Sequence, residues 1–265
     1  MKILGILNIT EDSFSDGGKY LEPSAALAHA RELAKDANIL DIGAASSNPD
    51  SSGVSPEMEI ARLQSVVPAL QRENISLSID TYSPAVQRWA LKQDVAYLND
   101  IHGFPDQSLY PEIAASSVRL IVMHAVQEWG KATRIEVPPS EIAGRIHRFF
   151  EQRLAALVKA GIARERLILD PGMGFFLGSD PETSFTVLRG LGELKRVFGL
   201  PVLVSVSRKS FLRRITGRAP SDSGPASLAA ELFAALQGAD FVRTHDPKAL
   251  RDGLAVWQAL DGNKP

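Results

Sequence analysis

The chain contains no cysteine among its 265 residues, which excludes disulfide bonds, thiolate metal sites and a cysteine nucleophile. Long hydrophobic runs are also missing, since no apolar stretch approaches the roughly 18 residues that indicate a membrane span. Charge of one sign is not in excess, because 29 basic and 31 acidic residues give a net charge of −2. We therefore expect neither nucleic acid nor a membrane surface as a partner, and any basic site must be local.

A targeting segment is not evident at the N-terminus, where the strand-like sequence MKILGILNIT begins at once. A cytoplasmic protein is therefore expected. A hydrophobic content of 45% and a charged content of 23% are typical of a soluble globular protein. The length would allow two small domains, but one α/β barrel needs about 250 residues and no linker interrupts the chain. We predict one domain over residues 1–265.

Short apolar stretches recur along the chain, and a helix-like segment follows each. The predicted strands are Ile3–Asn8, Ile39–Gly43, Ser76–Asp80, Tyr97–Asp100, Arg119–His124, Leu167–Asp170, Val202–Ser205 and Phe241–His245. The predicted helices cover about 23–36, 55–72, 83–93, 108–116, 140–160, 181–198, 224–238 and 247–261, the seventh region being broken at 216–225. This alternation predicts an α/β fold, a single (β/α)8 TIM barrel. An open doubly wound sheet is the alternative, but no G-x-G-x-x-G sequence follows any strand.

Polar residues cluster where the predicted strands end, which is where such barrels place their active sites. Asp41, Asp80, Asp170 and Asn99 all occupy such positions. Converging carboxylates could bind a metal, act as bases or accept hydrogen bonds from a donor-rich heterocycle. Each acid alone could simply cap the next helix or turn. The repeated placement favours a site.

Basic residues lie at or just beyond the ends of the last two predicted strands. Lys209, next to Arg208, could bind an anion, form a Schiff base as in aldolases, or belong to a solvated helix start. Arg243 and His245 share strand parity, so both side chains should project the same way and could grip a phosphate or diphosphate. The oxygen-rich segment 8–18 could supply a ligand to Mg²⁺, although its spacing alone indicates only a turn.

Seven motifs occur in order along nearly the whole chain. They are GILNIT with DSFSDGG near the N-terminus, SIDTY at 78–82, ND at 99–100, MH at 123–124, LDPGMGF at 169–175, SRKS at 207–210 and RTHD at 243–246. Together they resemble the dihydropteroate synthase family. The resemblance implies a transferase of folate biosynthesis that joins 6-hydroxymethyl-7,8-dihydropterin diphosphate to 4-aminobenzoate and releases diphosphate. It also implies Mg²⁺ as cofactor and a homodimer.

Site residues follow from the resemblance position by position. Pterin contacts fall on Asp80, Asn99, Met123, Asp170, Phe175 and Lys209. Aminobenzoate contacts fall on Ser47, Pro49 and Ser207, and the diphosphate contacts on Asn8, Arg243 and His245. Asn8 is also the expected metal contact. Catalytic positions of the family match Asp16, Asp41, Lys209, Arg243 and His245. In this setting Lys209 becomes a pterin and anion contact, and the aldolase hypothesis is disfavoured.

Two segments depart from the usual family pattern and resemble its sulfonamide-resistant branch. After the second strand, Asn48 stands where the family has arginine and Asp50 where it has glycine. In the next loop but one, Phe104 is a bulky aromatic next to glycine. Our hypothesis is that Phe104 shapes an aminobenzoate pocket that excludes the larger sulfonyl substituent, the alternative being that it only packs the loop. We therefore expect tolerance of sulfonamides.

Two other functions are compatible with a pterin pocket. A barrel methyltransferase using methyltetrahydrofolate and a corrinoid partner could share the pterin-binding acids, but it has less need for SRKS and for the Arg243–His245 pair. A non-catalytic pterin-binding protein would retain the pocket without turnover, and the altered second loop keeps this possibility open. Binding of dihydropterin without diphosphate release in the presence of aminobenzoate would distinguish it.

Overall fold

The computed structural model describes residues 1–10, 22–46, 53–127, 130–132 and 135–260. Asp16, Ser47 and Pro49 of the predicted site, and the unusual Asn48 and Asp50, lie outside the described residues. The strands are β1 Lys2–Asn8, β2 Ile39–Gly43, β3 Leu77–Asp80, β4 Tyr97–Asp100, β5 Arg119–Met123, β6 Leu167–Asp170, β7 Leu203–Val204 and β8 Phe241–Thr244.

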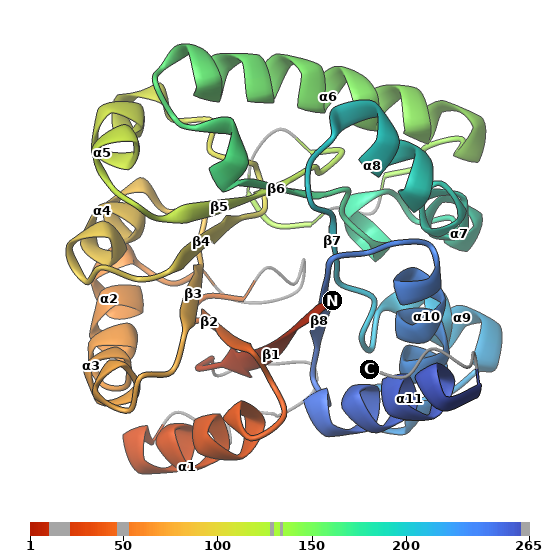
Figure 1. Ribbon diagram of the computed structural model, residues 1–265, viewed down its shortest axis with the longest axis horizontal. Coiled ribbons are helices and arrows are strands. Elements are labelled where there is room, and N and C mark those ends of the chain that lie inside the picture. Colours follow the sequence, from red (N-terminus) through yellow and green to blue (C-terminus); the bar gives the residue numbers. More distant parts are fainter. Residues whose placement is uncertain (11–21, 47–52, 128–129, 133–134, 261–265) are drawn as a thin grey trace.

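Helices surround the strands on the outside of the sheet (Figure 1). They are α1 Pro23–Ala34, α2 Pro56–Gln64, α3 Val67–Arg72, α4 Pro84–Lys92, α5 Tyr110–Ala115, α6 Pro139–Lys159, α7 Pro181–Arg189, α8 Leu191–Phe198, α9 Ser210–Thr216, α10 Gly224–Leu236 and α11 Pro247–Leu260. Short 3₁₀ turns lie between several of these elements. No helix in the described ranges is long and apolar enough to cross a membrane.

The strands form one parallel sheet in the order β6-β5-β4-β3-β2-β1-β8-β7. The two ends of this order are joined by a bridge between Leu169 and Val202, and the Leu169 N–H donates to the Pro201 carbonyl at 2.9 Å. The strands therefore close into a ring around the centre of the molecule (Figure 1). The predicted (β/α)8 barrel is confirmed.

Helix boundaries differ from the prediction where the chain carries a helix breaker. The region predicted as one helix over 55–72 divides into α2 and α3, because Pro68 in the first turn of α3 has no N–H for a helical bond. The region 181–198 divides at Gly190, which ends α7 and begins α8. The broken seventh region contains α9, which ends at Gly217 with a positive φ of 67°.

The barrel interior follows directly from strand periodicity, because alternate side chains point to opposite faces. One buried layer is apolar and consists of Leu4, Ile39, Tyr97, Ile121, Ile168, Leu203 and Phe241. Two residues further along the same strands come Ile6, Asp41, Asn99, Met123, Asp170, Ser205 and Arg243. The interior thus changes from apolar to polar toward the carboxyl ends of the strands. An apolar floor lies beneath a polar layer.

Candidate active site

The polar layer brings together side chains that are far apart in the sequence. Arg243 on β8 donates from Nε to Asp41 Oδ2 on β2 and from Nη2 to Asp80 Oδ2 on β3, the second bond measuring 2.8 Å. Asn99 on β4 donates from Nδ2 to the same Asp41 oxygen at 3.2 Å. One guanidinium therefore holds two carboxylates, and Asp41 orients an amide. The predicted convergence of these residues is present.

Several buried polar atoms in the barrel interior have no hydrogen-bond partner among the described residues. They are Asp41 Oδ1, Ser78 Oγ, Asn99 Oδ1 and Ser205 Oγ. Leaving such an atom unpaired costs about 1–3 kcal/mol, so unpaired groups are rare in native interiors. Four of them inside one barrel mark a place where a polar ligand would complete the hydrogen bonding.

Burial shifts the ionisation of two carboxyl groups in the layer. Burial raises the pKa of Asp80 to about 7, against the opposing attraction of Arg243. Burial also raises the pKa of Asp170 to about 6, although the Gly172 N–H donates to its Oδ1 at 2.8 Å and favours the ionised form. Burial by itself lowers the pKa of Arg243, but Asp41 and Asp80 outweigh this and the net shift is upward. The site keeps a fixed cation beside acids that titrate near neutrality.

Lys209 precedes the first turn of α9 and completes the charged part of the site. Its ammonium group lies 5.0 Å from the ring centroid of Phe176, a cation–π contact. Burial and the nearby charge of Arg243, opposed by Asp170 and Asp80, together lower the pKa of Lys209 to about 8. At neutral pH the amine is mainly protonated. A protonated amine binds anions and carbonyl oxygens but is not a nucleophile, so this protonation state favours such a contact for Lys209 over a Schiff base.

Ser207 and His245 form a hydrogen-bonded pair between the ends of β7 and β8. Ser207 Oγ lies 3.0 Å from Nδ1 of His245 and accepts the His245 backbone N–H at 3.2 Å. Burial, with help from Arg208, Arg243 and Lys209, lowers the pKa of His245 well below its usual value. The imidazole is therefore neutral. Ser207 Oγ accepts from the backbone, and its O–H faces two acceptors, Nδ1 of His245 and the carboxyl group of Glu231. When it donates to Nδ1, Nε2–H of His245 remains as a donor.

An apolar wall closes one side of the mouth of the barrel. Met123 and Phe176 are buried in one cluster with Ile101, and Phe175 packs against it. Gly172, with φ of +76°, lets the loop after β6 approach the carbonyl of His124, because a Cβ there would lie 2.3 Å from that oxygen. The sequence prediction included Met123 and Phe175. It missed Phe176, whose only signal was a second aromatic in the motif GFF.

Asn8 ends β1 beside the polar layer and provides a possible metal ligand. A Cβ built on Gly43 would lie 3.5 Å from Asn8 Oδ1 and 3.8 Å from Asp80 Oδ2, so two oxygens flank a space that any side chain at Gly43 would fill. Oxygen donors are what Mg²⁺ prefers, and it usually retains several waters. The residues present fit this ion. Among the described residues, however, no group of three His, Asp or Glu side chains forms a protein-only metal site.

Phe104 requires a correction to the sequence prediction. Its side chain is only 1% exposed and belongs to the main core cluster outside the barrel interior. Its backbone N–H donates to Asp100 Oδ2 at 3.0 Å, and its carbonyl accepts from the hydroxyl of Tyr110 at 2.9 Å. The aromatic packs the loop after β4 instead of lining a pocket. Burial of a large apolar ring outweighs the exposure that a loop position suggested.

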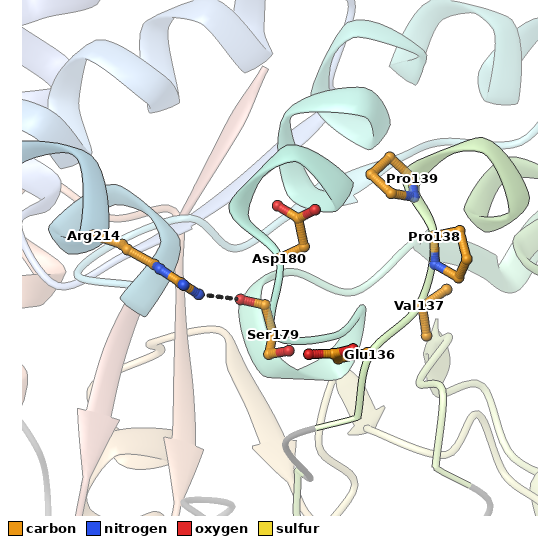
Figure 2. A pocket seen from close by; sticks show the side chains of 7 residues that line it. All are labelled: Glu136, Val137, Pro138, Pro139, Ser179, Asp180 and Arg214. Carbon is orange, nitrogen blue, oxygen red and sulfur yellow. Dashed lines mark hydrogen bonds between the residues drawn. The ribbon is translucent and has the colours of Figure 1, made fainter.

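A cavity of about 640 Å³ lies at the outer rim, between the segment preceding α6, the segment preceding α7, and α9 (Figure 2). Arg214 donates to the Ser179 carbonyl at 2.9 Å, and Asp180 caps α7 by accepting the Glu182 N–H at 2.9 Å. The Ser179 N–H donates to the carbonyl of Ile135 at 2.9 Å. These contacts connect α9 to the segments that precede α6 and α7. The contacts hold these segments together around the cavity.

Comparison with known proteins agrees with this geometry. Residues 4–245 match a family model described as pterin binding enzyme. The chain is 60% identical over 259 residues to the dihydropteroate synthase type-2 of Escherichia coli, which covers 97% of this chain and 95% of that relative. The fold and site thus define a pterin-binding enzyme. Within that class, the chain belongs to the dihydropteroate synthase family and is a transferase of folate biosynthesis.

Solved structures of this family superpose closely on the chain. Dihydropteroate synthase from Yersinia pestis, in complex with a sulfonamide drug, gives a TM-score of 0.89 at 33% identity over 98% of this chain and 94% of that one. The enzyme from Xanthomonas albilineans with 4-aminobenzoic acid gives a TM-score of 0.88 at 35% identity, and the match covers 100% of this chain and 94% of that one. The barrel is therefore that of the family.

Proposed function

We propose that this chain joins 6-hydroxymethyl-7,8-dihydropterin diphosphate to 4-aminobenzoate with release of diphosphate. The observation that carries the proposal is the polar layer inside the barrel, where unpaired buried oxygens converge above an apolar floor. A reduced pterin is a flat heterocycle with amino, ring N–H and carbonyl groups. Carboxylates, an amide and a cation are the complementary partners for these groups.

The pterin-binding roles follow from the hydrogen bonds that the free layer already makes. Because Asn99 donates from Nδ2 to Asp41, its Oδ1 is presented as an acceptor for a ring N–H. Asp170 uses Oδ1 on the Gly172 N–H, so Oδ2 can accept from the exocyclic amine. Asp80 and Lys209 would complete the polar contacts. Met123 and Phe175 would cover the ring from the apolar wall.

Diphosphate would leave toward the side of the barrel formed by β8. Arg243 uses Nε and Nη2 on carboxylates, so Nη1 remains for an oxygen of the leaving group. The neutral imidazole of His245 would donate from Nε2. Both donors are held before the reaction, so they can stabilise negative charge as it develops. The pterin ring delocalises positive charge at the methylene, which permits an SN1-like route without a covalent nucleophile.

We also propose Mg²⁺ as the cofactor, with Asn8 as its protein ligand. The ion would offset negative charge on the diphosphate oxygens. Aminobenzoate would approach along Ser207, with Ser47 and Pro49 contributing from the second loop. Asp41 and Asp16 complete the proposed catalytic set, and Asp41 acts by holding Arg243 and Asn99 in place. Loops that exclude water would keep it from capturing the cation.

Tolerance of sulfonamides and a homodimeric assembly are further parts of the proposal. Tolerance rests on the resemblance of the second-loop segment, with Asn48 and Asp50, to the sulfonamide-resistant branch. The homodimer has physical support in an apolar groove of about 500 Å³ formed by α7, α9 and α10. Ile215 and Phe233 line this groove and are 64% and 38% exposed. A second copy of the chain would cover them.

The deciding experiment is dihydropteroate formation from the two substrates, with and without Mg²⁺, titrated with a sulfonamide beside a sensitive reference enzyme. We expect turnover that depends on Mg²⁺ and persists at drug concentrations that block the reference. Turnover blocked at those concentrations would leave the reaction in place and refute the tolerance. Pterin binding without product would refute the reaction, and methyl transfer from methyltetrahydrofolate would assign the alternative activity.

A further inference from the structure

A pocket of about 480 Å³ lies on the outer side of the barrel wall, between the loops after β4 and β5 and helix α6. Its lining includes Arg145, Arg148, Arg153, His102, His124 and Gln127. No aspartate or glutamate is among the described residues that line it. Since the chain as a whole carries a net charge of −2, this concentration of guanidinium groups is a local feature.

The basic lining follows from the periodicity of α6. Ile142, Ile146, Phe150, Leu154 and Leu157 form the buried apolar stripe of this helix. Residues 145, 148, 149, 152 and 153 repeat at the same helical spacing on an adjacent stripe, and all of them line the pocket. One face of α6 therefore holds the core. The neighbouring face presents cations to the pocket.

The arginines have donors available for a ligand. Arg153 donates from Nη1 to the carbonyls of His102 and Gly103 at 3.1 and 2.7 Å, which fixes the guanidinium while leaving Nε and Nη2. Arg145 pairs with Glu141 at 3.0 Å on the exposed surface, where such a pair contributes little and can rearrange. Arg148 forms no ion pair among the described residues. Among the described residues, the pocket thus has more positive charge than its ion pairs neutralise.

Gln127 gives independent support for a ligand. Its side chain lines the pocket and is only 7% exposed, yet neither Nε2 nor Oε1 has a hydrogen-bond partner in the part of the chain that the structure describes. Two unpaired buried amide atoms are costly, and an isosteric apolar side chain would avoid that cost. An amide donor beside three guanidinium groups suits an oxyanion with several acceptor oxygens.

We propose that this pocket binds a small phosphoryl anion, inorganic phosphate or diphosphate, at a site separate from the barrel interior. Guanidinium forks match phosphate oxygens bidentately, and three such groups, with no carboxylate among the described residues of the lining itself, favour a multiply charged anion over a single carboxylate. The two histidines are neutral at pH 7, because burial lowers the pKa of His124 to about 4 and also lowers that of His102. They add hydrogen-bonding groups and no competing charge.

The test uses the imidazole NMR signals of the full chain, whose five histidines include His102 and His124 at the pocket and His245 in the barrel. Titration with inorganic diphosphate, and separately with inorganic phosphate, should shift the signals of His102 and His124 in a saturable way. The relative affinities identify which anion the pocket prefers. The His245 signal reports binding in the barrel in the same experiment, so binding at the two sites is measured independently.

Matched variants test whether the shifts of the His102 and His124 signals come from binding in the pocket. The double variant Arg145→Gln with Arg148→Gln should weaken the pocket response by about tenfold or more, because hydrogen bonds to a charged ligand are lost. It should leave the His245 response and turnover unchanged. Arg196→Gln on α8 removes an exposed arginine paired with Glu193 and should change neither response. Pocket signals that do not move in the wild type, or move equally in the double variant, would refute the site.

Gln127→Met provides a control for folding. It removes the unpaired amide while keeping an unbranched side chain of similar size, so we expect the melting temperature to rise or stay the same. The affinity of the pocket for the anion should nevertheless fall several-fold. An unchanged affinity would show that the amide takes no part in binding and would count against the proposed arrangement.

Discussion

At the scale of single residues, the site places carboxyl groups where their ionisation opposes folding. Burial raises the pKa of Asp170 to about 6 in the folded chain, whereas an unfolded aspartate has a value of about 3.9. The folded state thus retains this proton to higher pH than the unfolded state. The contribution of this proton to the free energy of unfolding is fully present below about pH 4 and is lost as the pH rises through about 6.

We therefore predict that Asp170→Asn gains stability relative to the wild type as the pH rises. The free energy of unfolding of the variant, minus that of the wild type, should increase by about 3 kcal/mol between pH 4 and pH 8, since each unit of pKa shift is worth about 1.4 kcal/mol. Urea denaturation at both pH values measures this. Asp252→Asn, at an exposed position on α11, is the control. A difference for Asp170→Asn that is the same at both pH values would contradict the assignment.

Phe104 leads to a second prediction, in which the usual order of two substitutions is reversed. Phe104→Ala should cost about 3–5 kcal/mol, because the ring is buried in the core. Glycine normally costs a further 0.5–1 kcal/mol or so compared with alanine, but here φ is +64° and alanine retains the left-handed strain of about 1 kcal/mol. Phe104→Gly should be at least as stable as Phe104→Ala in urea denaturation. A clearly less stable glycine variant would contradict the strain.

At the scale of elements, the loop after β6 depends on close packing against β5. A Cβ at Gly172 would lie 2.3 Å from the His124 carbonyl oxygen, and the backbone cannot yield there without moving the Asp170 hydrogen bond. Gly172→Ala should cost about 3 kcal/mol or more and reduce turnover. Gly199→Ala is the matched control: its φ of +59° is similar, but nothing lies within 4 Å, so the cost should be about 1 kcal/mol. Equal losses in thermal unfolding would show that the close approach is unimportant.

The elements also show how far sequence reasoning can reach. Asp41, Asn99, Asp170 and Arg243 could be placed together, because strand parity and the common edge of a parallel barrel determine where their side chains point. The direction in which the Phe104 side chain points could not be predicted, because a loop has no regular period and the Phe104 backbone has a positive φ. The basic stripe of α6 was also missed. It is visible in the sequence only when the buried stripe of the same helix is known.

At the scale of the whole molecule, the apolar groove on α7, α9 and α10 predicts the assembly. Phe233→Glu would place a charge in the surface that the proposed second copy would cover, so we expect a dimeric wild type and a monomeric variant. Light scattering after size-exclusion chromatography measures the mass. Val256→Glu on α11, at a position that is 60% exposed, should leave the dimer intact. A wild type that is monomeric, or a Phe233→Glu variant that remains dimeric, would rule out this interface.

Closure of the barrel through one short strand has a consequence for amide exchange. β7 has only two residues, and β6 reaches it through the Leu169–Val202 bridge and the Leu169 N–H bond. By contrast, β4 and β5 are paired over four residues. Local opening should therefore be most frequent at this seam, and deuterium should replace the Leu169 amide proton sooner than that of Leu120. Asp170 and Lys209 flank the seam. A pterin that contacts both would therefore hold β6 and the segment after β7 together and slow the exchange of the Leu169 amide proton.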